Sequence, residues 1–212
     1  MVEEIEKENM SATLLAPQYE FYHAEEFEVL YSGAFGAGKS RGLCYKMLPH
    51  ALIPGNRVGL CRKELAALKA TTLKTLLQEE GSPDADNYLP PVLPEGTYVH
   101  NKNERTIKIH GGGEIVYFGF DKQTRIGSLN VGAIGVDEAI ELEEDEYTWL
   151  LGRTRYSVDP CNQIFMATNP GDPNHFLYER FFEQENDERR GIRTSALDNP
   201  YLPDRYMQVL ED

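Results

Sequence analysis

Gly33-Ala34-Phe35-Gly36-Ala37-Gly38-Lys39-Ser40 is the stretch that decides the fold of this 212-residue chain. It fits the pattern G-x-x-x-x-G-K-[ST], in which glycines let successive backbone N–H groups turn inward around an anion. A short apolar run, Glu28–Tyr31, precedes it, and a helix is predicted after it from about Lys39 to Leu48. A strand, a glycine-rich turn and a helix N-terminus in this order predict a phosphate-binding loop.

Two side chains of this loop suit a nucleotide. Lys39 is placed to reach the β and γ phosphates, and the Ser40 hydroxyl suits Mg²⁺, which prefers oxygen ligands and retained waters. The candidate nucleotide-binding segment therefore runs from Gly33 to Ser40, with Arg41 beside it. The alternative is a glycine-rich turn that only resembles the pattern, but the strand and helix around it favour nucleotide binding.

Strand and helix signals alternate along the rest of the chain. In chain order they are a strand at 57–61, a helix at 64–78, a loop rich in Pro, Gly and Asp at 81–96, a hairpin at 105–119, a strand at 133–136, a helix at 143–151 and a strand at 163–167. Alternation of this kind predicts a mainly parallel sheet. The predicted fold class is α/β: a P-loop NTPase (ASCE/RecA-like) whose central sheet is flanked by helices and carries an antiparallel hairpin at one edge.

A second motif, Ala133-Ile134-Gly135-Val136-Asp137-Glu138, is an apolar strand that delivers two acids at its carboxyl end. Ligands of open α/β sheets bind at that end. Asp137 is predicted to hold the Mg²⁺ shell, and Glu138 to orient or deprotonate a water that attacks the γ phosphate. Two acids there could instead complement a helix dipole, but the motif at Gly33 to Ser40 favours the catalytic interpretation.

The acid directly after Asp137 favours an ATP-driven motor over a GTPase switch. The segment Asn101–Glu104 is superficially similar to the guanine-reading N-K-x-D signature. It ends in Glu and precedes the strand of Asp137, so we interpret it as a turn.

Two further segments carry polar groups near these motifs. The run Ile164–Pro170 predicts a buried strand that ends in Thr168 and Asn169, from which polar groups could sense the γ phosphate, although an ordinary strand and Asn-Pro turn is the alternative. Gln18 precedes the first strand, in a loop by this interpretation, and its amide can donate to and accept from an adenine edge. A lone Gln in a loop is more often exposed to solvent, so its assignment depends on the other motifs.

The formal charge of −14 argues at first against a nucleic-acid partner, because phosphate binding needs clustered lysine and arginine. The charge is uneven, since residues 1–30 carry eight acids and one base whereas residues 31–75 carry eight bases and one acid. One interpretation is a local basic surface. The other is a set of solvated charges, with Lys39 and Arg41 committed to a nucleotide.

The three cysteines, Cys44, Cys61 and Cys161, have no CxxC spacing and are predicted to be small, reduced core residues. No apolar run approaches the ~20 residues that span a bilayer. The acidic start of the chain also lacks the features of a signal peptide. We therefore expect a cytosolic protein with no membrane partner.

A set of short motifs, taken together, resembles the ATPase half of the large terminases of tailed phages. In chain order the motifs are Pro17-Gln18, the loop Gly33–Ser40, Arg62, Arg125-Ile126-Gly127, Val136–Ala139, Gly152–Arg155, Ala167–Pro170 and the tail at 198–210. The resemblance covers nearly the whole chain. Each motif alone is weak, and the specificity lies in their recurrence together at similar spacing.

The resemblance implies a role for each matched residue. Gln18 would read adenine, the P-loop with Lys39 would hold the phosphates, and Asp137 would bind Mg²⁺. Glu138 would be the catalytic carboxylate, while Thr168 and Asn169 would belong to a motif that couples hydrolysis to movement.

Arg125 matches the position of an arginine finger that acts across a subunit interface in some relatives, where a guanidinium stabilises the transferring phosphoryl group. Arg153, Arg155 and Arg41 are rival candidates. Each of these arginines could instead form a surface ion pair.

The resemblance also implies ATP and Mg²⁺ as substrate and cofactor. Its implied partners are double-stranded DNA, a portal protein and a small terminase subunit, and the assembled form would be a homo-oligomeric ring, with a monomer in isolation as the alternative. The setting would be the cytoplasm of an infected bacterial host and, transiently, the procapsid portal. Relatives usually continue into an RNase H-like nuclease domain. A single P-loop ATPase domain accounts for residues 1–212, so we expect no nuclease activity from this chain.

Two other functions compete with this one. A helicase-like, nucleic-acid-stimulated ATPase shares the Gln motif and both acidic and glycine-rich motifs, but it normally needs a second RecA-like domain. A nucleotide-binding assembly module with little hydrolysis of its own is the second alternative. The presence of Lys39, Ser40, Asp137 and Glu138 together argues against it.

Overall fold

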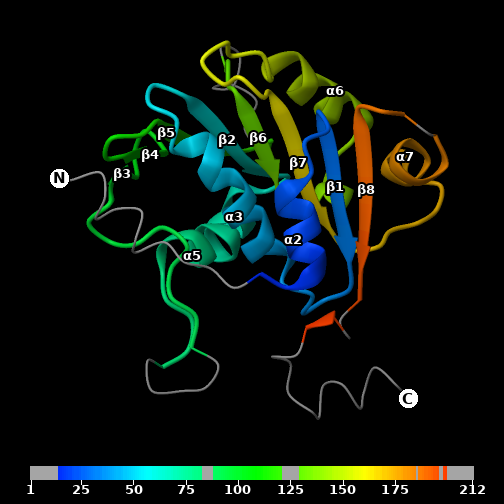
Figure 1. Cartoon of the computed structure of the whole chain (residues 1–212), viewed down its shortest axis with the longest axis horizontal. Coiled ribbons are helices and arrows are strands. Elements are labelled where there is room, and N and C mark those ends of the chain that lie inside the picture. The colour runs from blue at the N-terminus through cyan, green and yellow to red at the C-terminus, as the bar shows by residue number, and fades with distance from the viewer. Residues whose placement is uncertain (1–13, 83–87, 121–128, 185, 196–197, 200–212) are drawn as a thin grey trace.

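An eight-stranded sheet forms the centre of the computed structural model, which describes residues 14–82, 88–120, 129–184, 186–195 and 198–199 (Figure 1). The strands are β1 Glu28–Gly33, β2 Arg57–Arg62, β3 Tyr98–Asn101, β4 Thr106–Ile109, β5 Glu114–Gly119, β6 Ala133–Val136, β7 Gln163–Thr168 and β8 Arg189–Thr194. Their order is β3-β4-β5-β2-β6-β7-β1-β8. The run from β5 to β8 pairs in parallel, whereas β3 and β4 pair antiparallel at one edge. The predicted α/β P-loop NTPase fold is confirmed.

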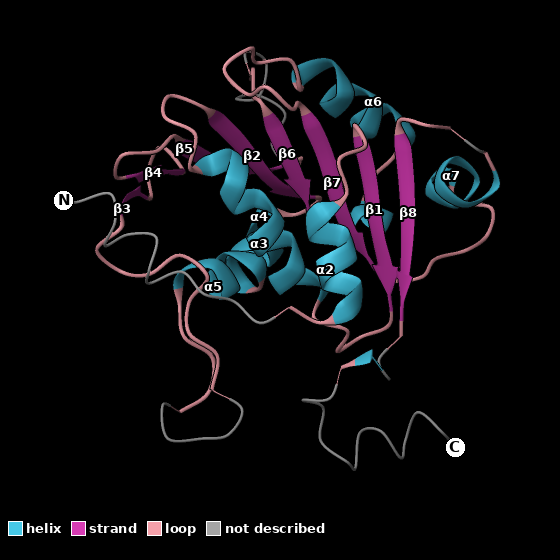
Figure 2. Cartoon of the chain, in the orientation of Figure 1, coloured by secondary structure: helices cyan, strands magenta, loops and turns pink. Residues whose placement is uncertain are grey.

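Helices cover both faces of this sheet, as Figure 2 shows. They are α2 Ala16–His23, α3 Lys39–Ala51, α4 Leu65–Ala70, α5 Thr72–Leu77, the short turn η2 Ala139–Glu141, α6 Glu144–Arg153, α7 Phe176–Tyr178 and the turn η3 Glu179–Glu183. Successive side chains of a strand point to opposite faces of the sheet, so β1 contributes side chains to a hydrophobic core on each face. Val29 and Tyr31 pack with α2 and α3, whereas Leu30 packs with α6 and α7 on the other face.

The carboxyl ends of three neighbouring strands meet at one edge of the sheet. β1 ends in the glycine-rich loop, β6 ends just before Asp137, and β7 ends at Thr168. The strands β6, β7 and β1 are adjacent and parallel, so these three segments lie side by side. Crossover connections in parallel sheets gather ligand-binding groups in this way.

The helix predicted over residues 64–78 is two helices, and that prediction is wrong in this detail. The chain breaks at Thr71, whose φ of −119° and ψ of −93° are not helical. Threonine hydroxyls compete for backbone groups, and here the Thr71 hydroxyl donates to the Ala67 carbonyl. The break turns α5 so that Thr72 contacts Asp137.

The sequence did not predict six of the described elements, namely the short segments η2, α7 and η3 and the longer β3, β8 and α2. The longer three lack the usual signals. β3 extends the predicted hairpin into a three-stranded antiparallel edge. β8 reads Arg-Arg-Gly-Ile-Arg-Thr and has a single apolar position, Ile192, yet it pairs along the whole of β1. α2 carries Gln18, which the sequence placed in a loop.

The predicted loop at 81–96 has no helix or strand within its described residues, and a single bridge joins Leu89 to Glu80. Cys44 and Cys61 are buried as expected. The prediction for Cys161 is wrong, because this side chain is exposed in the turn before β7.

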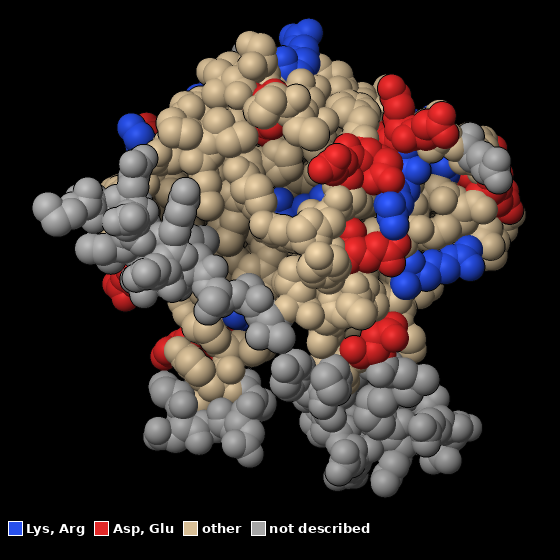
Figure 3. Space-filling model, viewed as in Figure 1, with Lys and Arg blue, Asp and Glu red and all other residues tan. Residues whose placement is uncertain are grey.

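Charged side chains are unevenly spread over the face seen in Figure 3. Acidic and basic groups gather together where α2 and β8 lie in Figure 1, and there Arg190 pairs with both Glu20 and Glu26. Within the described residues, no helix combines the length and apolar character needed to cross a membrane.

Candidate nucleotide site

The glycines of the loop between β1 and α3 are required by its backbone. Gly36 and Gly38 have φ values of 78° and 69°, in the left-handed region that residues with a Cβ rarely adopt. Gly33 serves close packing instead, because a Cβ there would lie 2.7 Å from the backbone oxygen of Thr194 on β8. The loop thereby closes tightly over the edge strand and delivers Lys39 as the first residue of α3.

The remaining loop residues hold the loop's own shape. The Ala34 carbonyl accepts a hydrogen bond from Lys39, and the buried Ala37 has its carbonyl 3.5 Å from the Tyr31 hydroxyl. Phe35 is 70% exposed, and its ring centre lies 5.9 Å from the Lys39 Nζ. All eight residues of the predicted loop are thus found together at the N-terminus of α3.

Lys39 is a buried ammonium group, with only 8% of the residue exposed. Its Nζ donates to the Ala34 carbonyl at 2.7 Å and to Asn169 Oδ1 at 2.9 Å. Burial lowers the pKa of Lys39, and the nearby carboxylates of Glu138 and Asp137 oppose that shift. The cation is therefore held between the loop and the end of β7.

Asp137 is 2% exposed and receives two hydroxyl hydrogen bonds. Ser40 Oγ lies 3.3 Å from Asp137 Oδ1, and Thr72 Oγ1 makes a short hydrogen bond to Oδ2. Arg62, paired mainly with Glu141, has Nη1 3.7 Å from Asp137 Oδ2. Burial raises the pKa of Asp137, while the Thr72 hydrogen bond and the Arg62 charge act against that rise.

A magnesium ion fits this donor set. Mg²⁺ in phosphate-transfer sites keeps several waters and takes one or two protein oxygens, with substrate phosphates supplying the rest. One carboxylate and one hydroxyl, Asp137 and Ser40, provide those oxygens here. Among the described residues there is no cluster of three or more His, Cys, Asp or Glu that could hold a metal without such help.

Glu138 stands in a strained backbone conformation. Its φ of 46° and ψ of 53° lie in the left-handed region, which is unusual for a residue other than glycine. Strain of this kind costs about 1–3 kcal/mol and occurs often at functional sites. The carboxylate accepts hydrogen bonds from Asn169 Nδ2 at 2.9 and 3.1 Å. Burial, followed by the charge of Asp137, raises the pKa of Glu138.

Asn169 therefore joins two of the predicted catalytic residues. Its oxygen accepts from Lys39, and its nitrogen donates to Glu138. The neighbouring Thr168 hydroxyl accepts from the backbone N–H of Ile140, in the turn that follows Glu138, at 3.0 Å. The end of β7 is thus tied both to the loop and to the acidic motif.

Gln18 lies on α2, is buried, and uses both ends of its amide within the protein. Nε2 donates to the Gly38 carbonyl at 2.8 Å, and Oε1 accepts from the Leu15 N–H at 3.0 Å. A Cβ on Gly42 would sit 3.4 Å from the Gln18 side chain, so α2 and α3 pack closely here. In this structure Gln18 positions the glycine-rich loop.

The candidate arginines are differently placed. Arg125 lies outside the described residues. Arg41 donates to the Pro90 carbonyl and to the Tyr45 hydroxyl, and its Nη1 is buried with no hydrogen-bond partner. Arg153 stacks on Trp149 at the end of α6, and the Arg155 N–H donates to the Val131 carbonyl. Val131 precedes β6, so Arg153 and Arg155 lie at the amino edge of the sheet, opposite the glycine-rich loop.

Two residues near the loop were missed from the sequence. Thr72 gave a signal in hindsight, since adjacent threonines inside a predicted helix favour a break. Asn199 donates from Nδ2 to the Gly36 carbonyl at 2.6 Å, which brings the described end of the chain onto the loop. A single Asn far from the motif in sequence carries no local signal of this contact.

Comparisons with known proteins bear on the family and the fold of this chain. Residues 95–212, more than half of the chain, match a family model described as phage terminase large subunit. No curated protein sequence matches the chain significantly.

Three solved structures illustrate the likeness in fold. The large terminase from the thermophilic bacteriophage D6E has a TM-score of 0.74 and 14% identity, covering 94% of this chain and 50% of that one. The same terminase in complex with ATP-gamma-S has a TM-score of 0.70 and 14% identity, covering 94% and 49%. The Thermus phage P74-26 large terminase ATPase domain has a TM-score of 0.64 and 10% identity, covering 95% and 87%.

The chain spans about half the length of the D6E terminase and most of the P74-26 domain. At these identities the structural likeness establishes the P-loop NTPase fold, and the family assignment comes from the matched sequence of residues 95–212. This chain belongs to the phage terminase large subunit family.

Proposed function

We propose that this chain is the ATP-hydrolysing domain of a packaging motor that drives double-stranded DNA into a phage procapsid. The observation that carries the proposal is the contact of Asn169 with both Lys39 and Glu138. A cation, a carboxylate and an amide meet at this point, beside the Asp137–Ser40 pair, and their proximity supports the proposal. Phosphoryl transfer to water requires groups in these roles and in this proximity.

Lys39 and the loop are proposed to bind the phosphates of ATP. Backbone N–H groups of a glycine-rich loop and the N-terminus of α3 favour an anion. The Lys39 ammonium now bonded to Ala34 and Asn169 would transfer to phosphate oxygens, which are stronger acceptors for a buried cation. Gln18 would support adenine recognition through its hold on Gly38 and α2.

Ser40 and Asp137 are proposed to hold Mg²⁺. When bound, the ion would neutralise charge on the β and γ phosphate oxygens. Thr72 and Arg62 contact the Asp137 carboxylate and oppose the rise in its pKa that burial causes.

Glu138 is proposed to orient the attacking water and to take its proton. A pKa raised by burial suits a general base, because the group then has a stronger affinity for that proton. Loss of the Lys39 contact would leave Asn169 free to respond to the γ phosphate. Thr168 would carry that response to the turn after Glu138, which is the coupling role predicted from the sequence.

Ring assembly would complete the site. An arginine supplied by a neighbouring subunit can be worth about 10³–10⁵ in rate in other P-loop enzymes. Arg125 is the first candidate for this finger, while the positions of Arg153 and Arg155 at the opposite edge of the sheet fit a contact made across subunits better than one within the chain. A portal protein and a small terminase subunit are the proposed partners, in the cytoplasm of the bacterial host and at the procapsid.

Glu138→Gln tests the catalytic assignment. The variant should keep ATP binding, measured by equilibrium titration, and lose most Mg²⁺-dependent hydrolysis, because an amide cannot accept the proton of the attacking water. Lys39→Ala should weaken binding as well. Near-normal turnover by Glu138→Gln would remove Glu138 from its role.

Arg125→Ala tests the finger. If Arg125 acts across an interface, mixing Arg125→Ala with Glu138→Gln should restore hydrolysis, since each chain supplies the half-site that the other lacks. Absence of rescue in an assembled ring would assign the arginine to the same chain as the nucleotide.

A further inference from the structure

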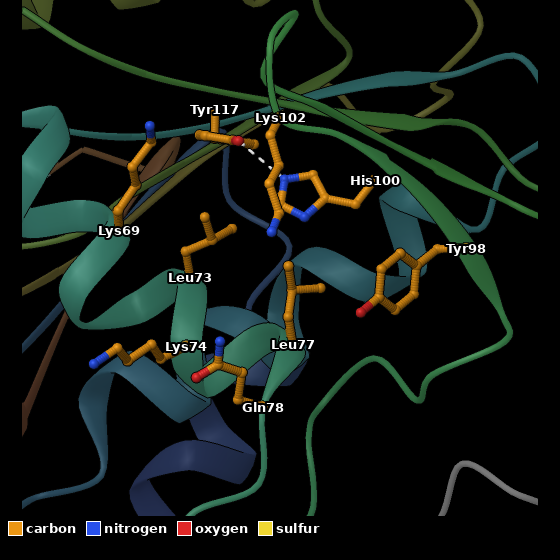
Figure 4. A pocket seen from close by; sticks show the side chains of 9 residues that line it. All are labelled: Lys69, Leu73, Lys74, Leu77, Gln78, Tyr98, His100, Lys102 and Tyr117. Carbon is orange, nitrogen blue, oxygen red and sulfur yellow. Dashed lines mark hydrogen bonds between the residues drawn. The ribbon is translucent and has the colours of Figure 1, made fainter.

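A cavity of about 380 Å³ lies between α5 and the antiparallel edge of the sheet, away from the glycine-rich loop (Figure 4). Its polar and aromatic lining includes Lys69, Lys74, Lys102, Tyr98, His100 and Tyr117. Leu73 and Leu77 of α5 face Tyr98 and His100 across it, as Figure 4 shows. The three lysines come from α4, α5 and the turn after β3, so the fold gathers them from separate segments.

These three lysines have no carboxylate within ion-pair distance in the described part of the chain. Other bases of the protein do: Arg57 pairs with Glu114, and Lys63 pairs with Glu146. Two acids that follow α5 are also committed elsewhere, since Glu79 accepts from Tyr88 and Glu80 accepts from Thr75. One carboxylate, that of Glu95, lies near enough to raise the pKa of Tyr98 beyond the effect of burial. The three lysines still outnumber it, so the cavity carries an excess of positive charge on a chain whose formal charge is −14.

The pKa of His100 responds to burial and to the positive charge of two of these lysines. Burial lowers its pKa, and the charges of Lys102 and Lys69 lower it further. His100 Nε2 lies 2.9 Å from the Tyr117 hydroxyl, which fixes the ring in the wall of the cavity. A wall of aromatic groups with ammonium groups at its rim suits a phosphodiester chain, whose sugars can pack on rings while its phosphates meet lysines.

The cavity is connected to the nucleotide site through one short helix. α5 begins at Thr72, whose hydroxyl bonds Asp137, and two residues later Lys74 lines the cavity. Arg62, which lies 3.7 Å from Asp137, is also 3.4 Å from the Thr71 hydroxyl at the break between α4 and α5. A ligand that shifts α5 would therefore act on the residue proposed to hold Mg²⁺.

We propose that Lys69, Lys74 and Lys102 form a contact site for the phosphate backbone of double-stranded DNA, joined by α5 to Asp137. The proposal rests on the proposed function in taking duplex DNA as the ligand. An acidic protein segment is the competing ligand. It is less favoured, because acidic peptide motifs are recognised by clusters of arginine, whereas the bases that border this cavity are lysines, which bind phosphate as point charges.

The experiment measures binding of a fluorescent 30-base-pair duplex by anisotropy as the salt concentration increases from about 50 to 200 mM. Each lysine that neutralises one phosphate contributes about 0.9 to the slope of log affinity against log salt. Lys69→Ala, Lys74→Ala and Lys102→Ala should each lower that slope by about this amount, and Lys74→Arg should restore it. Lys69, Lys74 and Lys102 are exposed, so the three alanine variants should keep the basal rate of Mg²⁺-dependent ATP hydrolysis measured without DNA.

Lys108→Ala is the matched control. Tyr98 pairs with Ile109 and His100 pairs with Ile107, and residues directly opposite in antiparallel strands share a face. Lys108 lies between those two isoleucines, so its side chain points to the other face of the same hairpin. Its removal should leave the salt slope nearly unchanged.

Three outcomes would overturn the site. They are no duplex binding by the unaltered chain at low salt, an equal loss of slope in Lys108→Ala, or tighter binding of polyglutamate than of the duplex. The last result would assign the cavity to an acidic protein partner. Retained ATP hydrolysis in any of these cases would leave the proposed catalytic function intact, whereas loss of hydrolysis alone would contradict that function and not the site.

Discussion

Asn169 connects the two sides of the candidate nucleotide site. A primary amide can donate and accept at once, and here it accepts from Lys39 while donating to Glu138. Replacing it with a hydrophobic residue would take one hydrogen-bond partner from the buried Lys39 and the donor from the partly buried Glu138. The sequence placed Asn169 at the end of the correct strand, but the contact with Lys39, 130 residues away, follows only from the order of the strands.

The raised pKa of Glu138 predicts the pH range in which the rate of hydrolysis falls on the acid side. A protonated Glu138 cannot accept a proton from water, so kcat/KM should fall as pH drops through a value above the usual glutamate range. Asn169→Ala should move this acid limb to still higher pH, because hydrogen bonds from the amide favour the ionised carboxylate. A profile of kcat/KM against pH for both proteins checks this. An unshifted limb in Asn169→Ala would contradict the assignment of that limb to Glu138.

Lys46 makes a separate prediction about stability. It is 2% exposed, and burial lowers its pKa to about 8. Between about pH 8 and the ordinary lysine value of 10.5, the unfolded chain holds a proton that the folded chain has released. Stability therefore rises with pH across this window through Lys46.

Lys46→Met should abolish that component, although Lys46 also donates to the Ala24 carbonyl and its loss lowers stability overall. The measurement is the free energy of unfolding in urea at pH 8, 9 and 10 for both proteins. The difference between the unaltered chain and Lys46→Met should grow in favour of the unaltered chain as pH increases. A difference that is constant with pH would show that the lysine is not desolvated.

At the scale of elements, the β1–β8 pair illustrates how packing overrides local sequence. β8 carries three arginines among its six residues and offers no strand signal, but β1 supplies a fully buried partner for it. Gly33 makes their close approach possible at the mouth of the nucleotide site. The strands β1, β6 and β7 were predictable, because each is a short apolar run that can be recognised from its own sequence alone.

Gly33→Ala should separate these two strands at the glycine-rich loop. Its Cβ would meet both the side chain and the backbone oxygen of Thr194, and a backbone atom cannot move aside cheaply. We expect a loss of about 1–3 kcal/mol in unfolding free energy together with weaker ATP binding.

Gly152→Ala is the control for that substitution. A Cβ at Gly152 meets nothing within 4 Å, and alanine is favoured over glycine inside a helix such as α6. Its unfolding free energy should increase by up to about 1 kcal/mol. Equal effects of the two substitutions in chemical denaturation would contradict the packing account.

The break between α4 and α5 was not predicted from helical spacing, because the apolar periodicity continues through it, and its local signal is the pair Thr71-Thr72. The Thr72 hydroxyl then contacts the distant Asp137. Thr72→Val keeps the shape of the side chain and removes the hydroxyl. The buried carboxylate then loses a donor, which costs about 1–3 kcal/mol and raises the pKa of Asp137 further. Hydrolysis should need more Mg²⁺ for half-maximal rate. Thr148→Val, at an exposed position on α6 whose hydroxyl donates to the Glu144 carbonyl, should change this requirement little.

At the scale of the whole molecule, one sheet edge gathers the groups that we propose for phosphoryl transfer, and a cavity bordered by three lysines lies at the antiparallel side. The sequence predicted the first because its motifs are local, and each motif ends a strand. It did not predict the second, because Lys69, Lys74 and Lys102 converge only after α5 packs against the hairpin. The uneven charge of residues 31–75 was compatible with a basic surface or with separate solvated charges, and most of those bases are paired or buried in the structure.

Steady-state ATP hydrolysis with Mg²⁺, measured over a wide range of protein concentration with Glu138→Gln as the blank, tests the central claim most directly. The account predicts turnover that requires Mg²⁺, disappears in Glu138→Gln, and climbs per chain as concentration brings neighbouring subunits together. Hydrolysis that persists undiminished in Glu138→Gln, or no hydrolysis at any concentration, would contradict it.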